Sequence, residues 1–239
     1  MTTEREAESP GESVETTRRR LSGMAGLGMS VGRLEAFSDG VFAIVITLLI
    51  LDIKVPAAGE GPLGRALADQ WPQYAAYLVS FFVVGIVWLN HHAMIQLLAR
   101  ADHTLQVLNL LLLLPISVLP WPTAVLADYV REGTTADQRV AVLLYGFTSS
   151  AMGVGFNLLW RAILRRPGLW RPGVDRASLT VRNRRYNAGV CVYPVATLLG
   201  LLSVPLFLVL MLALALLFLL PTPEVRAASR GEDGPAGDG

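Results

Sequence analysis

The chain has 239 residues, of which 53% are hydrophobic and 16% are charged. Soluble domains carry about a quarter charged residues, so this composition is typical of a membrane protein. A formal net charge of +1 disfavours a nucleic-acid binder, and a single cysteine, Cys191, excludes a disulfide framework or a cysteine metal site within one chain.

The chain opens with a polar segment and then a first apolar one. Residues 1–30 are rich in Glu, Thr, Ser and Gly, and we expect a disordered tail. Residues 33–55 are predicted to form the first membrane helix, because they run apolar from 41 to 51 with Thr47 as the one break. A helix of this length spans roughly 30 Å, which is enough to cross the hydrocarbon of a bilayer.

The first helix is predicted to have two different faces. At about 100° per residue, Asp39 points away from a stripe that lies within an arc of about 100°, and this stripe consists of Ile44, Thr47, Leu48 and Leu51. Ionisable groups inside membrane segments default to a functional role. An ordinary core helix, with Thr47 bonded to its own backbone and Asp39 as an N-terminal cap, is the alternative interpretation.

Further apolar runs predict five more helices and hence an all-α polytopic membrane protein with six transmembrane helices per subunit. Glycines 146, 153 and 155 of the fourth helix are predicted to allow close helix approach. A basic loop, 165–185, precedes the last helical hairpin, and residues 221–239 are expected to be a disordered tail. The predicted helices cover residues 73–98, 104–127, 139–164, 186–202 and 205–220, so residues 31–220 form one transmembrane domain.

The distribution of positive charge predicts the orientation in the membrane. Only four of the 20 Lys and Arg lie in the first, third and fifth connections: Lys54, Arg65, Arg131 and Arg139. By the positive-inside rule, both tails and the basic loop are therefore expected in the cytoplasm, with the chain in the plasma membrane. Asp39 then lies near the cytoplasmic end of the first helix, and Asp52 lies at the outer mouth.

Two polar tracts carry a resemblance to a known family. The first has Arg33, Phe37, Ser38 and Asp39 ahead of the apolar run, and the second is residues 88–92, which contain Trp88, Asn90, His91 and His92. Together they resemble the motifs of helices one and two in the transmembrane protein 175 family. These proteins are potassium channels of endosomes and lysosomes, with single-repeat homologues in bacteria. The likeness extends over about residues 33–220.

The resemblance implies a channel whose pore is lined by the first helix. Because this chain has one repeat, four copies are needed, and the implied assembly is a homotetramer in the lipid bilayer. Ile44 matches the isoleucine constriction of the family, and Thr47 matches the threonine linked to potassium selectivity. Leu48 and Leu51 would add apolar rings, and apolar constrictions gate by dewetting. The resemblance implies K⁺ as the permeating ion, and no cofactor is expected.

One histidine is predicted to bond a carboxylate or a carbonyl across the bundle, and a metal site is not expected. Adjacent histidines point to different faces of a helix, and no acidic tract accompanies them. We expect Asp39 to pair with His91 or His92 and to tie helix one to helix two, as a structural contact or as a proton sensor. The motif side chains would then hold the first helix in register without touching the ion: Arg33, Phe37, Ser38, Trp88 and Asn90.

Three classes of function compete at this point. A cation channel is favoured by the resemblance. A proton-coupled secondary transporter that uses an intramembrane Asp–His pair is the alternative, although no inverted repeat is visible. A membrane enzyme is disfavoured, because the sequence has no paired-acid, nucleophile–base or histidine-box arrangement.

Overall fold

The computed structural model describes residues 30–58, 61–174 and 176–219, and these residues form helices and no named strand. The two tails that we expect to be disordered lie outside the described residues, apart from Ser30. The first predicted helix is α2 (Val31–Leu48), which continues as the 3₁₀ helix η1 (Leu49–Asp52). Ser30 caps α2, because its hydroxyl accepts from the backbone N–H of Arg33. Asp39 is therefore not the N-terminal cap.

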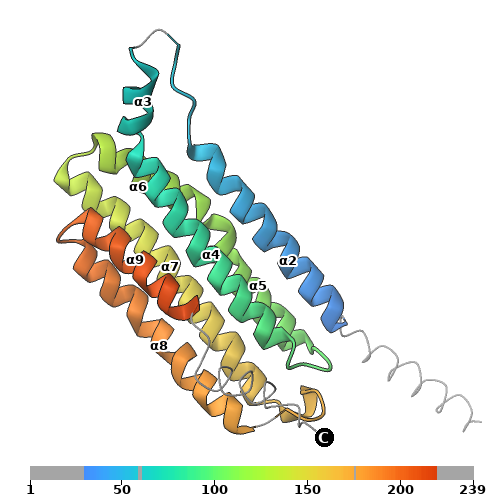
Figure 1. The fold of residues 1–239 in the computed structure, drawn as a ribbon. Coiled ribbons are helices and arrows are strands. Elements are labelled where there is room, and N and C mark those ends of the chain that lie inside the picture. The colour runs from blue at the N-terminus through green and yellow to red at the C-terminus, as the bar shows by residue number, and fades with distance from the viewer. Residues whose placement is uncertain (1–29, 59–60, 175, 220–239) are drawn as a thin grey trace, which may run out of the picture.

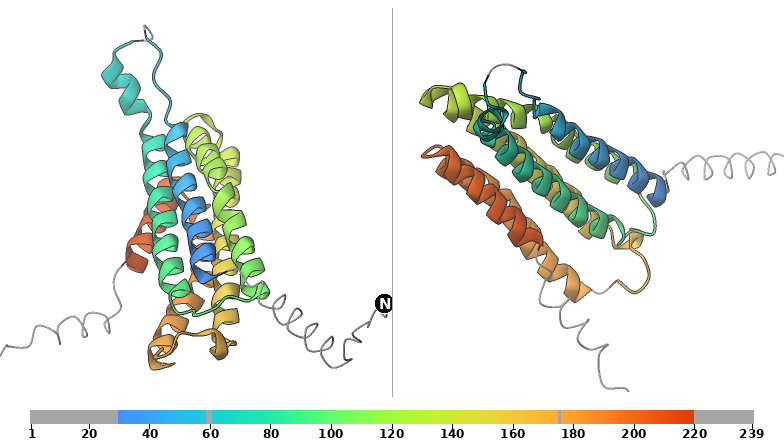
Figure 2. Two further views of the ribbon diagram at one scale, coloured as in Figure 1. Left: turned by 90° about the vertical axis from the view of Figure 1, so that its right-hand side faces the viewer. Right: turned by 45° about the horizontal axis from the view of Figure 1, so that its top comes forward.

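The other helices follow in the predicted order. After a short helix, α3 (Leu63–Asp69), come α4 (Trp71–Ile95), α5 (His103–Val118), α6 (Pro120–Glu132) and α7 (Thr135–Leu164). The 3₁₀ turn η2 (Pro167–Leu169) leads to α8 (Arg176–Gly200) and α9 (Val204–Leu219). Figures 1 and 2 show the long helices running side by side, with α2 at one edge of the bundle and α8 and α9 at the other.

Contacts between helices define the layers of the bundle. The outer helix, α2, packs on α4 and α5, while α5 and α6 pack on α7. On the far side, α8 packs along α7, and α9 covers α4 (Figure 1). The basic loops and the start of α2 gather at one end of the bundle, where the backbone N–H of Ala99 donates to the carbonyl of Leu169. We call this the arginine-rich end.

The predicted third, fourth and fifth helices differ most from the helices in the structure. The predicted third helix is divided at Leu119, because Pro120 has no N–H to continue the helical hydrogen bonds. The fourth begins at Thr135 and not at 139, since Thr134 and Asp137 form a capping box. The fifth begins at Arg176 and not at 186, so the predicted basic loop is partly helical.

Four helical segments among the described residues are long and apolar enough to cross a membrane: Val31–Asp52, Trp71–Ile95, His103–Glu132 and Thr135–Leu164. The last helix, α9, is apolar but has 16 residues, and α8 combines an arginine-rich first half with an apolar second half. The predicted all-α membrane class is confirmed. The count of six crossings stays a prediction.

The glycines of α7 bring its neighbours close, as predicted. A Cβ at Gly155 would lie 3.0 Å from the Cα of Leu112 on α5, and one at Gly153 would lie 3.1 Å from the Tyr193 ring on α8. A Cβ at Gly146 would collide with the side chain of Thr197. Small residues therefore let α5 and α8 pack tightly on α7.

Candidate functional site: the two faces of α2

One face of α2 is buried against α4 and α5. It consists of Val31, Leu34, Ser38, Phe42 and Val45, and Leu49 of η1 continues it. The opposite face is exposed in a single protomer and contains the predicted stripe. Ile44 is 60% exposed, Leu48 41% and Leu51 70%. These side chains are not core residues of the protomer, so the core-helix interpretation fails for them.

Thr47 lies on the same exposed face, and its hydroxyl is bonded within the helix. Its Oγ1 lies 3.0 Å from the carbonyl oxygen of Ala43 and 2.8 Å from that of Ile44. The hydroxyl has a single proton, which it donates to these carbonyls. Toward the exposed side, Thr47 therefore offers only the lone pairs of its oxygen.

A buried polar network ties α2 to both of its neighbours. Ser38 Oγ donates to the carbonyl of Leu34 at 2.9 Å, and it accepts from Asn109 Nδ2 at 2.9 Å. The amide oxygen of Asn109 lies 2.7 Å from His91 Nε2. Because a carbonyl oxygen can only accept, this geometry assigns the proton of the imidazole to Nε2. The network joins α2, α4 and α5 in the core.

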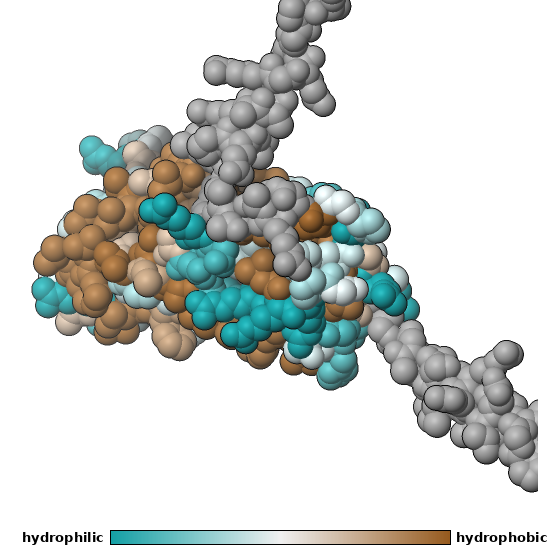
Figure 3. Space-filling view, turned by 90° about the horizontal axis from the view of Figure 1, so that it is seen from below, coloured by the Kyte–Doolittle hydropathy of each residue, from teal (hydrophilic) through white to brown (hydrophobic). Residues whose placement is uncertain are grey.

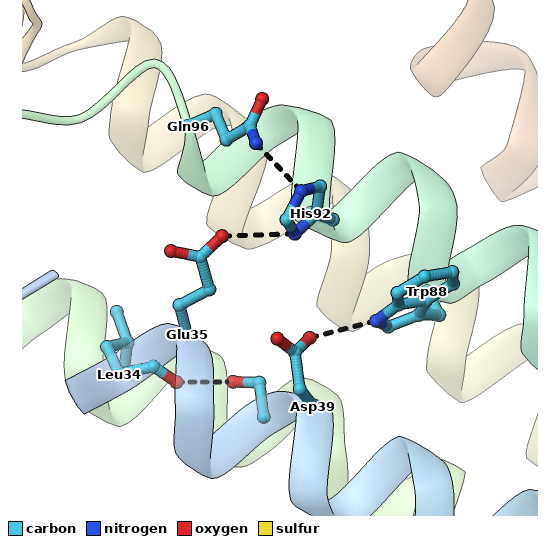
Figure 4. A network of polar contacts seen from close by, with 7 residues as sticks. Leu34, Glu35, Asp39, Trp88, His92 and Gln96 are labelled. Carbon is cyan, nitrogen blue, oxygen red and sulfur yellow. Dashed lines mark hydrogen bonds and ion pairs between the residues drawn. The ribbon is translucent and has the colours of Figure 1, made fainter. Parts of the chain in front are cut away.

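A second set of contacts joins α2 to α4 and is partly exposed. The indole Nε1 of Trp88 donates to Asp39 Oδ1 at 2.8 Å. The carboxylate of Glu35 lies 3.0 Å from His92 Nδ1, and Gln96 Nε2 lies 2.7 Å from the other ring nitrogen of His92. Figure 4 shows both acids of α2 reaching toward α4.

The structure therefore gives Asp39 a different partner from the predicted histidine. Residues 35 and 39 are one turn apart on α2, and residues 88 and 92 are one turn apart on α4. Equal spacing on the two helices lets residue 35 contact residue 92 while residue 39 contacts residue 88. A carboxylate–imidazole contact does exist, but it joins Glu35 to His92. Asp39 is instead bonded to the neutral indole of Trp88.

Some predicted network residues do not join these contacts. Arg33 is exposed, and its side chain has no polar partner among the described residues; Phe37 is also exposed, and Asn90 Nδ2 donates to its own helix at Ile86. Asn109, which joins both sides of the buried network, was missed. Its signal is a single amide in the apolar run of residues 107–114.

Asp52 lies at the opposite end of the first span from Glu35 and Asp39. It is half-buried at the last position of η1, ahead of the exposed Lys54. Within the described ranges, no three His, Cys, Asp or Glu side chains gather in a way that could hold a metal ion.

Together these features define a class of protein. It is a helical membrane protein whose first span is fixed by polar contacts on one face and presents an unpaired apolar face on the other. The model of the family described as "Endosomal/lysosomal potassium channel TMEM175" matches residues 33–120. That match covers α2, α4 and α5, the helices that build the two faces of the site.

Similar proteins extend the match over most of the chain. A potassium channel of Streptomyces collinus is 46% identical over 202 residues, which cover 83% of this chain and 97% of the relative. A potassium channel of Chamaesiphon minutus is 39% identical over 192 residues, covering 79% and 93%. The crystal structure of a lysosomal potassium-selective channel TMEM175 homolog from Chamaesiphon minutus aligns with a TM-score of 0.70 at 38% identity, covering 79% and 95%. This chain belongs to the TMEM175 family, as its motifs predicted.

Proposed function

We propose that this protein is a potassium-permeable channel in which four copies surround a pore lined by the exposed face of α2. The observation that carries the proposal is the contrast between the two faces of that helix. Apart from Arg33, the polar side chains of the two motifs form contacts within the protomer, while Ile44, Leu48 and Leu51 stay exposed. The potassium channels to which the chain is similar support K⁺ as the ion.

The narrowest part of the closed pore is assigned to Ile44. A ring of branched side chains narrower than a hydrated ion imposes a dehydration barrier, because it offers no oxygens in exchange for water. Leu48 and Leu51 lie one and two turns further along the same face and lengthen the dry segment. Thr47 adds hydroxyl oxygens whose protons are already donated, and bare lone pairs suit a cation.

The distribution of arginine supports the orientation that we propose. The arginine-rich end, with both tails, faces the cytoplasm of a cell whose plasma membrane holds the channel. Six crossings, including α8 and the shorter α9, bring both tails to the same side. In a Cys191→Ser background, a cysteine at the exposed Gly168 should react only from inside, and one at Ala58 only from outside. Reversed labelling would contradict this orientation.

A proton-coupled transporter remains the competing proposal, because a carboxylate–imidazole contact exists between Glu35 and His92. This contact lies near the start of α2 and is partly exposed, whereas transporter sites lie near the middle of the bilayer. Its position favours a structural contact over a proton relay. Unitary current steps in a planar bilayer would establish a channel, and saturable flux without such steps would establish a carrier.

Shortening the side chain at position 44 tests the pore. In reconstituted, correctly assembled protein, Ile44→Ala should widen and wet the constriction and raise basal K⁺ flux, while Ile44→Asn should also weaken discrimination against Na⁺. Ile46→Ala is the matched control, because Ile46 is partly buried against the core and should leave flux unchanged. A fall or no change in flux at position 44 would reduce the exposed stripe to a packing surface between copies.

The same preparation gives the mass of the assembly. We expect four copies of the 25.9 kDa chain in a detergent-corrected mass measurement. A stable monomer or dimer that still conducts would exclude a fourfold pore.

A further inference from the structure

The helix α7 is longer than the hydrocarbon core of a bilayer is thick. With 30 residues, α7 is about 45 Å long, whereas the hydrocarbon core is about 30 Å thick. Its last turn contains Arg161, and Arg165 follows as the C-cap, one turn away; both are exposed. If this arginine-rich end lies at the membrane surface, as we propose, these side chains meet the headgroups and apolar side chains one turn deeper meet the acyl chains.

An open groove of about 480 Å³ lies between these arginines and the start of α5. At the arginine-rich end the groove is lined by Arg161, Arg165 and Thr104 of α5. Toward the middle of the bundle it is lined by Leu108 and Leu158. On the other flank of the same two arginines, a second hollow of about 310 Å³ is bordered by Asn183 and Asn187 of α8. Figure 3 views the molecule from below and shows hydrophilic residues gathered beside apolar surface.

Among the described residues, the positive charge of this groove is balanced only in part. Arg166, at its edge, is paired with Asp102 at 2.9 Å and also donates to the carbonyl of Ala162. Arg161 and Arg165 have neither an ion pair nor a side-chain hydrogen bond in the part of the chain that the structure describes. Like charges one turn apart on a helix repel each other, so an anion between them would stabilise the arrangement.

We propose that this groove binds an anionic phospholipid, with its phosphate between Arg161 and Arg165 and one acyl chain along Leu108 and Leu158. Guanidinium groups pair with phosphate oxygens in a fixed fork, and the Thr104 hydroxyl can donate to the same phosphate. Basic pockets between membrane helices are the sites where anionic headgroups bind. The apolar floor distinguishes a lipid from a free phosphate, because free phosphate gains nothing from it.

Two simpler roles explain the arginines only in part. Positive charge near the C-terminus of a helix is favourable, and arginines at one end of a bundle set its orientation. Either role is met by any arginine at this end. Neither requires two unpaired arginines, a hydroxyl of another helix and two leucines to border one groove.

Lipid titration of the full-length chain, followed by native mass spectrometry, tests the proposal. Phosphatidylglycerol and phosphatidylcholine with the same acyl chains are compared as probes. The double variant Arg161→Gln, Arg165→Gln should bind phosphatidylglycerol about 30-fold more weakly, because each arginine near an anionic surface raises the affinity about fivefold. Its affinity for phosphatidylcholine should be unchanged. If the double variant does not fold, Arg165→Gln alone should lower the affinity about fivefold.

The control removes the same charge elsewhere at the same end. Arg100 and Arg184 are exposed and lie outside the groove, so the variant Arg100→Gln, Arg184→Gln should keep its phosphatidylglycerol affinity. Equal losses in both double variants, or none in the first, would overturn the site. Displacement of the lipid by inorganic phosphate at equal concentration would overturn the acyl-chain contact. Binding is the readout, so the result does not depend on conduction.

Discussion

The two faces of α2 differ in what one protomer supplies to them. On the packed face, Ser38, His91 and Asn109 are buried polar residues joined by hydrogen bonds, and Phe42 lies against the His91 ring with centroids 5.5 Å apart. On the other face, branched aliphatic side chains are exposed. Each of these three polar residues has a hydrogen-bond partner within the chain, although His91 Nδ1 is buried without one among the described residues. The packed face is therefore largely satisfied in one chain, whereas the exposed aliphatic side chains need lipid or other copies to cover them.

The largest expected loss of stability comes from truncating a phenylalanine on the packed face, and a phenylalanine on the exposed face is its control. Phe42 is 1% exposed and Phe37 is 50% exposed. Phe42→Ala should lower the free energy of unfolding by about 3–5 kcal/mol, because it leaves a cavity between α2 and α4. Phe37→Ala should change it by about 0.5 kcal/mol or less. Resistance to denaturation by SDS measures both, and equal losses would show that the faces are not distinct within a protomer.

A smaller effect is expected in the buried network. Asn109→Leu leaves the Nε2–H of His91 without its acceptor, and a buried unsatisfied donor costs about 1–3 kcal/mol. Asn90→Leu is the control, since Asn90 bonds only to the backbone of its own helix. The unfolding assay should separate the two leucine variants. If they are equally stable, the contact between α4 and α5 through Asn109 does not hold the packed face together.

The smallest effect is expected where the packed face reaches solvent. The side chains of Glu35 and His92 are 24% and 37% exposed, and ion pairs in such positions contribute about 0.2–1 kcal/mol. A double-mutant cycle with Glu35→Gln and His92→Gln should give a coupling energy in this range, and the coupling should shrink as salt is added. A coupling of several kcal/mol, independent of salt, would mean that this contact is buried in the assembled protein.

The periodicity of the sequence was enough to predict which residues share one face of a helix. The spacing of Ile44, Leu48 and Leu51 placed them on one face, and that face is the exposed one in the structure. The glycines of α7 were likewise recognisable, because their only advantage inside an apolar helix is close approach. Both predictions depend on the angle between residues within one helix, which the sequence determines directly.

Pairings between helices could not be predicted in the same way. Glu35 and Asp39 of α2 contact His92 and Trp88 of α4, respectively. A shift of one residue along either helix would turn these side chains by about 100°. Since His91 and His92 are adjacent, the register alone decides that one meets Asn109 and the other Glu35. The start of α8 was missed because arginines are good helix formers that give no apolar signal.

The central claim is that the exposed face of α2 lines the pore of an assembly, which is dry when closed and wet while it conducts. Cysteine substitution tests it most directly, in a Cys191→Ser background with K⁺ flux measured during exposure to a charged thiol reagent. Leu48→Cys and Leu51→Cys should be modified and should lose flux, whereas Leu49→Cys, at a position that is 0% exposed, should be unaffected. Flux that is insensitive to the reagent at positions 48 and 51 in conducting protein would contradict a pore lined by this face.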